Sequence, residues 1–147
     1  MVKHPFITYP SKAAAVQQVG DVISKTFVNE PGQVSFGTID YVPGWRISLH
    51  HHNTWELIII DSSSAGPGFV MFDSRWWRAE PGSAVFVPAG FPHAWSSGNQ
   101  KGFKMLWVYG GAQQEAGRTY DVAPEAFRAI SRDEESRATI WTDTSRP

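Results

Sequence analysis

The residues best suited to chemistry lie in two short segments of the chain. In the first, His50, His51 and His52 are consecutive and Glu56 follows after three more residues. Side chains alternate between the faces of a strand, so His50 and His52 share one face and His51 takes the other. A short turn then lets Glu56 return beside them. Two imidazoles and a carboxylate suit zinc, iron, manganese, nickel or copper, although adjacent histidines also fit a polar strand end facing solvent.

The second segment ends in one histidine. Pro81-Gly82 predicts a tight turn, residues 84–87 an apolar strand, and Pro88 with Gly90 a second turn that presents His93. A lone histidine in such a turn is also consistent with a satisfied surface residue. The residues of this segment alone leave both interpretations open.

The elements that must position these residues are short apolar runs separated by turns, which predict successive strands. The runs cover residues 34–42, 45–52, 56–60, 69–72, 76–79, 84–87 and 103–109. Helix signals occur only at 11–19 and at 124–130, where Pro124 occupies a first-turn position. From Arg132 onward, charged and small polar residues predict a solvated tail.

Seven or eight antiparallel strands without a βαβ rhythm predict an all-β sandwich or barrel. The length of 147 residues is that of one domain, 1–147, with the strand-rich part at about 34–110. The flanks, 1–33 and 111–147, carry no functional motif.

Composition excludes several classes of protein. The chain has 41% hydrophobic and 18% charged residues, which excludes a disordered chain. Its net charge of −1 gives no reason to expect nucleic acid or a membrane surface as a partner. Cysteine is absent, so disulfides, thiolate metal sites and cysteine nucleophiles are excluded. With no long apolar run and no secretory leader, we expect a cytoplasmic protein.

Together the two segments resemble the paired motifs of the cupin superfamily. The first motif places glycine, His-x-His and glutamate at a spacing that is met here by Gly44, His50, His52 and Glu56. The second places glycine, Pro-x-Gly and histidine at a spacing that is met by Gly82, Pro88, Gly90 and His93. The resemblance covers about 36–109. Two turns depart from it, the tract 61–68 and position 97, where Ser97 replaces the usual Asn.

The resemblance implies a fold and a cofactor. The fold is an antiparallel double-stranded β-helix, or jelly-roll barrel, with one or two short helices. The cofactor is one divalent transition metal per chain, with Fe(II) favoured and Zn, Mn or Ni as alternatives. The ligands that the resemblance implies are His50, His52, Glu56 and His93.

Strand alternation predicts which side chains surround that metal. Arg46 and Ser48 share the face of His50, whereas Trp45, Ile47 and Leu49 face outward. Arg46 is the candidate to pair with a substrate carboxylate or enolate, although it also fits a solvated rim position.

Further pocket candidates come from other strands. Ile58 supplies an apolar wall, and Phe91 and Trp95, which flank His93, are candidates to stack on a ring-shaped substrate. Tyr41 and Tyr109, with Tyr120, are the candidate proton donors. Each of these aromatic residues also fits simple packing in the core.

The predicted function is that of a mononuclear metal enzyme acting on a small carbonyl, enolic, phenolic or carboxylated compound. The aromatic pocket favours a dioxygenase. The alternatives are a non-redox lyase, isomerase or cyclase, and a cupin that binds a small molecule without catalysis. The adjacent Trp76 and Trp77 imply that one of them is exposed or at an interface, where it could anchor a homodimer.

Overall fold

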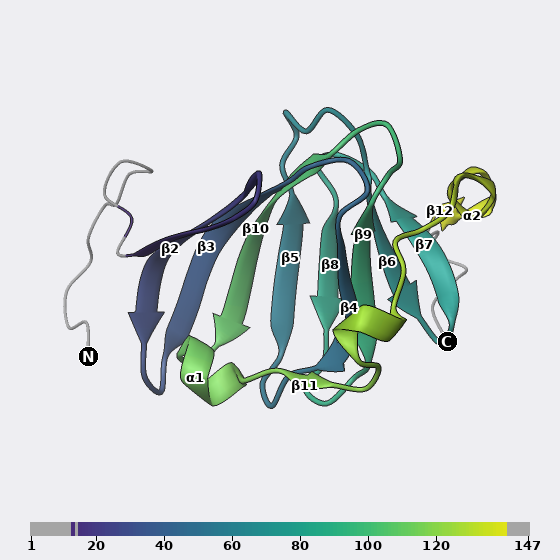
Figure 1. The fold of residues 1–147 in the computed structure, drawn as a ribbon. Coiled ribbons are helices and arrows are strands. Elements are labelled where there is room, and N and C mark those ends of the chain that lie inside the picture. Colours follow the sequence, from purple (N-terminus) through teal and green to yellow (C-terminus); the bar gives the residue numbers. More distant parts are fainter. Residues whose placement is uncertain (1–12, 14, 141–147) are drawn as a thin grey trace.

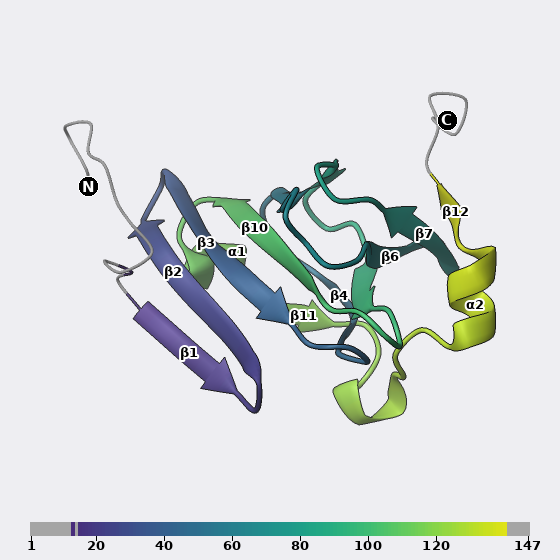
Figure 2. The same ribbon diagram turned by 90° about the horizontal axis from the view of Figure 1, so that it is seen from above.

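Two six-stranded sheets make up the molecule (Figures 1 and 2), in a computed structural model that describes residue 13 and residues 15–140. The first sheet contains, in spatial order, β1 (Ala15–Val19), β2 (Val22–Glu30), β3 (Val34–Tyr41), β10 (Phe103–Gly110), β5 (Glu56–Ile60) and β8 (Ala84–Val87). The second contains β11 (Thr119–Tyr120), β4 (Arg46–His51), β9 (His93–Ser97), β6 (Gly68–Phe72), β7 (Arg75–Ala79) and β12 (Thr139–Ile140). The predicted all-β architecture is confirmed.

All seven predicted strands are present, with ends that differ by no more than one residue. Their alternation places the core between the sheets. On β10, Phe103, Met105, Trp107 and Tyr109 are buried, while Lys104 between the first two is exposed. The interior cluster draws on both sheets, as its members Tyr41, Ile58, Ile60, Val70, Trp95, Phe103, Met105, Trp107 and Tyr109 show. Because the strands contribute alternate residues to this interior, their register decides which side chains reach it.

The N-terminal flank contains strands that the sequence pattern did not reveal. Residues 15–19, inside the predicted helix 11–19, form β1, while residues 11, 12 and 14 lie outside the described part. Alanine and glutamine favour a helix, but pairing with β2 overrides that local preference. β2 lies so close to β3 that a Cβ on Gly37 would come 2.0 Å from the Lys25 carbonyl oxygen. Gly37 is therefore what allows these strands to approach.

The C-terminal flank is packed on the outer face of the second sheet, where a solvated tail was predicted. Ile130 is 1% exposed and packs with Phe69, Trp76 and Ala94. Of the predicted helix 124–130, only Pro124–Ala126 is helical, as a short 3-10 turn. The packing of this segment covers Trp76, and Trp77 is half-buried, so neither is exposed within the chain, and a place for one of them at an interface stays a prediction. The homodimer stays a prediction.

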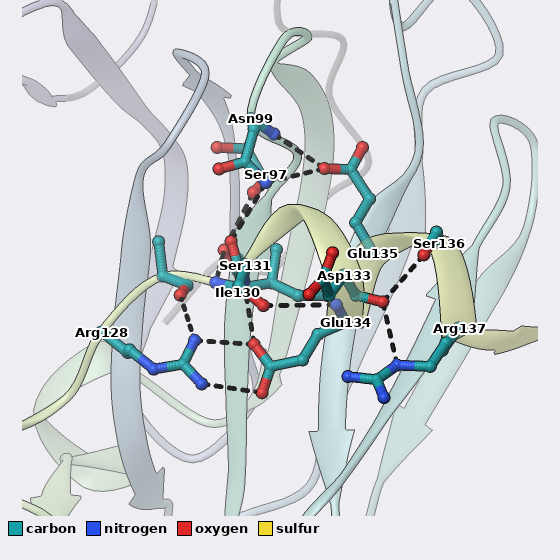
Figure 3. A network of polar contacts seen from close by, with 12 residues as sticks. Ser97, Asn99, Arg128, Ile130, Ser131, Asp133, Glu134, Glu135, Ser136 and Arg137 are labelled. Carbon is teal, nitrogen blue, oxygen red and sulfur yellow. Dashed lines mark hydrogen bonds and ion pairs between the residues drawn. The ribbon is translucent and has the colours of Figure 1, made fainter.

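Helix α2 (Arg132–Arg137) is held in place by a polar network, which Figure 3 shows. The Ser131 hydroxyl accepts from the Glu134 backbone N–H, and the Glu134 carboxylate accepts from the Ser131 N–H. Asn99 donates to Glu135 at 2.8 Å, which links α2 to the loop after β9. These contacts explain why a charged segment is ordered although its side chains face solvent.

The segment that follows β10 crosses one end of the barrel (Figure 1). Helix α1 (Gln113–Ala116) leads into β11, which pairs with β4 at His51 and His50. The Glu115 carboxylate accepts from the backbone N–H groups of Gly32 and Ala112, and so fastens α1 to the β2–β3 turn. Among the described residues, no helix is long and apolar enough to cross a membrane.

The packing of the C-terminal flank is tested by two isoleucines. We expect Ile130→Ala to lower the free energy of unfolding by about 2–5 kcal/mol, because it removes a buried side chain from a close-packed cluster. Ile140→Ala is the matched control, since Ile140 is 55% exposed, and it should change stability by less than about 1 kcal/mol. Urea unfolding followed by tryptophan fluorescence measures both. Equal effects would contradict the described packing.

Candidate metal centre

Four candidate metal ligands converge from separate elements. His50 lies on β4 directly opposite His93 on β9, in the second sheet, and His52 follows β4. Glu56 is the first residue of β5, in the first sheet. One nitrogen of each imidazole and one oxygen of the carboxylate all lie within 4.8 Å of one another, and all four residues are buried. The structure therefore brings together the set that the two motifs implied, and this cluster could hold a metal ion.

Each histidine of the cluster is oriented by a backbone carbonyl. His50 Nδ1 lies 2.7 Å from the Ser48 oxygen and His93 Nδ1 lies 3.0 Å from the Phe91 oxygen, while His52 Nδ1 contacts the Gly117 oxygen. A carbonyl can only accept, so each Nδ1 must carry the proton and donate it. Each Nε2 is then the nitrogen that faces the centre of the cluster. This arrangement is typical of metal-binding histidines, whose outer nitrogen is hydrogen-bonded to the protein.

The inner side of the cluster is short of protons. Glu56 Oε2 lies 2.8 Å from His93 Nε2 and 3.6 Å from His52 Nε2. His52 Nε2 is buried without a hydrogen-bond partner among the described residues. A hydrogen bond can join His93 Nε2 to the carboxylate, but none joins His52 Nε2 to it, and a cation between these atoms would satisfy the unpaired nitrogen. The donor set therefore fits a borderline divalent ion, which imidazole nitrogen and carboxylate oxygen bind together.

Burial keeps the imidazoles in the form that binds metal. Removal from water, with His93 as a further neighbour, lowers the pKa of His50 from 6.5 to about 2. Burial also lowers the pKa of His52, although Glu56 acts in the opposite direction. Both rings are therefore neutral at neutral pH, with a lone pair available on Nε2.

The turn between the motif strands ties the two segments together. Gly90 has a φ of +75°, which strains any residue with a side chain, and its N–H donates to the His52 carbonyl at 2.8 Å. The Asn53 N–H donates in turn to the Ala116 carbonyl at 2.7 Å. The loop that carries His52 is thus held by the second motif on one side and by α1 on the other.

A cavity of about 560 Å³ adjoins the cluster through Tyr109 and Tyr120, although none of the four candidate ligands lines it. Its polar lining includes Tyr41, Ser48, Tyr109, Arg118 and Tyr120. The Tyr109 ring is 4.7 Å from the His52 ring, and the Tyr120 ring is 6.1 Å from the His50 ring, measured between centroids. The cavity has the volume typical of sites for small organic molecules.

Tyr41 and Tyr109, the candidate proton donors, both line this cavity. Burial raises the pKa of both hydroxyls well above the usual value for tyrosine, with the nearby Glu56 carboxylate as a further cause. Both therefore remain protonated at neutral pH and can donate hydrogen bonds. The Tyr41 hydroxyl is buried and has no hydrogen-bond partner among the described residues.

Arg46 faces away from the position expected for it. Ile47 pairs with Trp95 and His50 with His93, so β4 holds one extra residue between Ile47 and His50. This bulge reverses the alternation and turns Ile47 toward the interior cluster that contains Trp95. Arg46 instead donates from Nε to the Phe127 carbonyl at 2.7 Å, on the outer face and at the cavity rim.

The bulge also changes the direction in which the side chains next to Arg46 point. Trp45, like Ile47, packs against the interior cluster, although both were expected to face outward. Ser48 lines the cavity as predicted, and its hydroxyl donates to the Val122 carbonyl at 2.5 Å.

The remaining pocket candidates lie outside the residues that line the cavity. Ile58 and Trp95 are buried in the interior cluster, where Trp95 packs against Phe103. Phe91 is 36% exposed on its turn, with its ring 5.8 Å from that of Phe72. The structure thus does not bring Phe91 and Trp95 together as a stacking surface beside this cavity.

Arg118 is the residue near the cluster that sequence reasoning missed. It follows Gly117, whose carbonyl holds His52, and precedes β11, which pairs with β4. Its side chain hydrogen-bonds the hydroxyls of Tyr109 and Tyr120. No motif marks it, because its position depends on how the C-terminal flank crosses the barrel end.

Comparisons with known proteins agree on the fold. The family model for the AraC-like ligand binding domain matches residues 33–139. No curated protein matches the sequence.

Three solved structures illustrate the structural similarity. The polyketide cyclase RemF from Streptomyces resistomycificus is 14% identical, with a TM-score of 0.67 over 84% of this chain and 89% of that one. A cupin-like protein from Thermotoga maritima is 16% identical, with a TM-score of 0.63 over 90% and 98%. KdgF from Halomonas sp. is 12% identical, with a TM-score of 0.61 over 76% and 98%. At these identities the similarity shows the fold alone.

Metal content tests the ligand set. We expect purified protein to carry about one divalent transition metal ion per chain, and His50→Ala and His93→Ala to lower metal affinity at least about tenfold. His51→Ala is the matched control, because His51 points away from the cluster and its Nδ1 lies 2.9 Å from the Asp121 carboxylate. Elemental analysis after dialysis against a weak chelator measures all four proteins. Equal metal loss in His51→Ala would contradict the assignment.

The lowered pKa of His50 predicts how stability depends on pH in metal-stripped protein. Between pH 6.5 and about 2, the unfolded chain binds a proton at His50 that the folded protein excludes. The free energy of unfolding should therefore be greatest above pH 6.5 and fall with decreasing pH, by up to about 1.4 kcal/mol per pH unit for this one group. Urea unfolding at several pH values measures the slope. A slope that is unchanged in His50→Gln would show that His50 is not the group responsible.

Proposed function

The chain belongs to the AraC-like ligand binding domain family and is a cupin, and from this membership and its buried His/Glu cluster we propose that it is a mononuclear metal-dependent enzyme. The observation that carries the proposal is the orientation of the cluster. All three imidazoles donate their outer N–H to backbone carbonyls and leave Nε2 beside the Glu56 carboxylate. Barrel packing alone has no use for such an arrangement.

The substrate we propose is a small carbonyl, enolic, phenolic or carboxylated compound. A cavity of about 560 Å³ beside the cluster supports this size class. A divalent ion held by His50, His52, Glu56 and His93 would supply Lewis-acid polarisation of a substrate oxygen. Tyr109, which is protonated at neutral pH and lies beside His52, would donate a hydrogen bond to an oxygen on which negative charge develops.

We propose non-redox chemistry of the lyase, isomerase or cyclase type in preference to a dioxygenase. The preference for a dioxygenase depended on Phe91 and Trp95 as a stacking surface, and neither lines the cavity. The lining includes the rings of Trp45 and Trp107, but its polar side nearest the cluster has the hydroxyls of Tyr109 and Tyr120 and the guanidinium of Arg118, which suit the stabilisation of an enolate-like charge. The fold is shared with a polyketide cyclase, which is consistent with this class.

Binding without catalysis is the second candidate. It is favoured by the family model, which describes a ligand binding domain. A binder would use the same cavity and would retain affinity without any turnover. A dioxygenase with Fe(II) remains the redox alternative.

Hydrogen–deuterium exchange separates these functions. We expect Zn(II)-loaded protein under argon in D₂O to catalyse exchange of the protons next to the carbonyl in a member of a panel of 2-oxo acids, β-diketones and cyclic ketones, observed by proton NMR. Tyr109→Phe should lower the rate at least about tenfold, because it removes a donor to the developing negative charge. His51→Ala, outside the cluster, should match wild type.

Two other results of these assays would support the alternative functions instead. Turnover that requires Fe(II) and consumes dioxygen in an oxygen electrode would contradict the non-redox proposal and support a dioxygenase. Saturable binding of panel compounds with no turnover under any metal would contradict the enzyme and support a binding protein.

A further inference from the structure

We propose that Arg118, together with the hydroxyl of Tyr41, forms a carboxylate-binding subsite beside the metal centre, so that the substrate is a small carboxylate. This inference rests on the proposed function for its meaning, since it names the class of compound that the site would act on. The subsite itself stands on contacts of described residues that involve no metal.

The first observation is the position of Arg118. The residue is exposed at the cavity mouth, where a ligand can reach it, and its side chain lines the cavity. The preceding Gly117 carbonyl contacts His52 Nδ1, and the following strand β11 pairs with β4 at His50. The chain that carries Arg118 is thus anchored on both sides to residues of the candidate metal centre. A group bound by Arg118 would lie next to the cluster.

The second observation is the charge that Arg118 leaves unbalanced. Among the described residues, no carboxylate forms an ion pair with it. Its hydrogen-bond partners are the neutral hydroxyls of Tyr109 and Tyr120. Glu125 lines the outer part of the same cavity, and Glu56 belongs to the metal cluster, but neither is paired with the guanidinium. A planar guanidinium presents paired donors that match the two oxygens of a carboxylate.

The third observation is independent of Arg118. Tyr41 is 6% exposed, lines the cavity, and its hydroxyl is buried without a hydrogen-bond partner among the described residues. Such an orphaned donor costs free energy unless an acceptor arrives. One orphaned donor and one cation that line the same cavity define a site for an anion.

The test uses benzoate and its neutral analogue benzamide as probes on metal-stripped protein. Binding is followed by ¹H–¹⁵N NMR, including the Nε–H signals of arginine side chains. We expect saturable shifts with benzoate that include the Arg118 Nε–H, and binding of benzamide at least about tenfold weaker, because it lacks the charge. Equal binding of the two probes would overturn the proposal.

Three variants assign the binding to named residues. Arg118→Gln should weaken benzoate binding at least about tenfold, whereas Arg128→Gln, which removes an exposed arginine outside the cavity, should leave it unchanged. Tyr41→Phe should weaken it several-fold while leaving the unfolding temperature unchanged or higher, since the lost hydroxyl has no partner in the protein. Benzoate affinity that is unchanged in Arg118→Gln or in Tyr41→Phe would overturn the subsite.

Failure of this inference and failure of the proposed function have different signatures. If metal binds at the cluster but benzoate binding does not depend on Arg118, the subsite is refuted and the metal enzyme stands. If benzoate binding depends on Arg118 but no metal binds, the proposed function is refuted and the chain is a carboxylate-binding cupin.

Discussion

Three imidazoles and a carboxylate are held out of water at one point of this barrel, and their inner polar atoms outnumber the hydrogen bonds among them. The outer nitrogens are committed to the carbonyls of Ser48, Phe91 and Gly117, so the rings cannot turn away to find other partners. Burial of the rings also lowers the pKa values of His50 and His52, which makes a proton a poor substitute for a metal ion. The surrounding elements serve to keep these four groups in place: paired strands β4 and β9, the start of β5, and the chain leading into β11.

The cluster could be predicted from sequence because each half has a local spacing and the resemblance to the cupin motifs joins the halves. Strand alternation places His50 and His52 on one face, whereas that His93 lies opposite them followed only from the resemblance. Alternation failed on the same strand at Arg46, because a bulge between Ile47 and His50 adds one residue without any signature in the sequence. Strand alternation therefore predicted the direction of His50 correctly and that of Arg46, four residues earlier, wrongly.

The flanks show a different limit of sequence reasoning. β1 looked helical by composition, and the segment around Ile130 looked solvated, since neither pairing partners nor packing surfaces are visible in a local window. Arg118 lies in such a segment. It reaches the metal centre only because β11 joins the edge of β4, an association between residues about 70 positions apart. The motifs thus account for the candidate ligands, while the groups that would select a substrate come from a flank without a motif.

The central claim is that His50, His52, Glu56 and His93 form one metal centre, and the most direct test is a crystal structure of the metal-loaded protein with anomalous diffraction data at the edge of the bound metal. The account predicts a single peak bonded to the three Nε2 atoms and to a Glu56 oxygen, at about 2.0–2.2 Å. The peak should face the cavity that contains Arg118 and Tyr41. A peak at other residues, ligation through Nδ1, or a cluster that stays free of metal in the loaded crystal would contradict it.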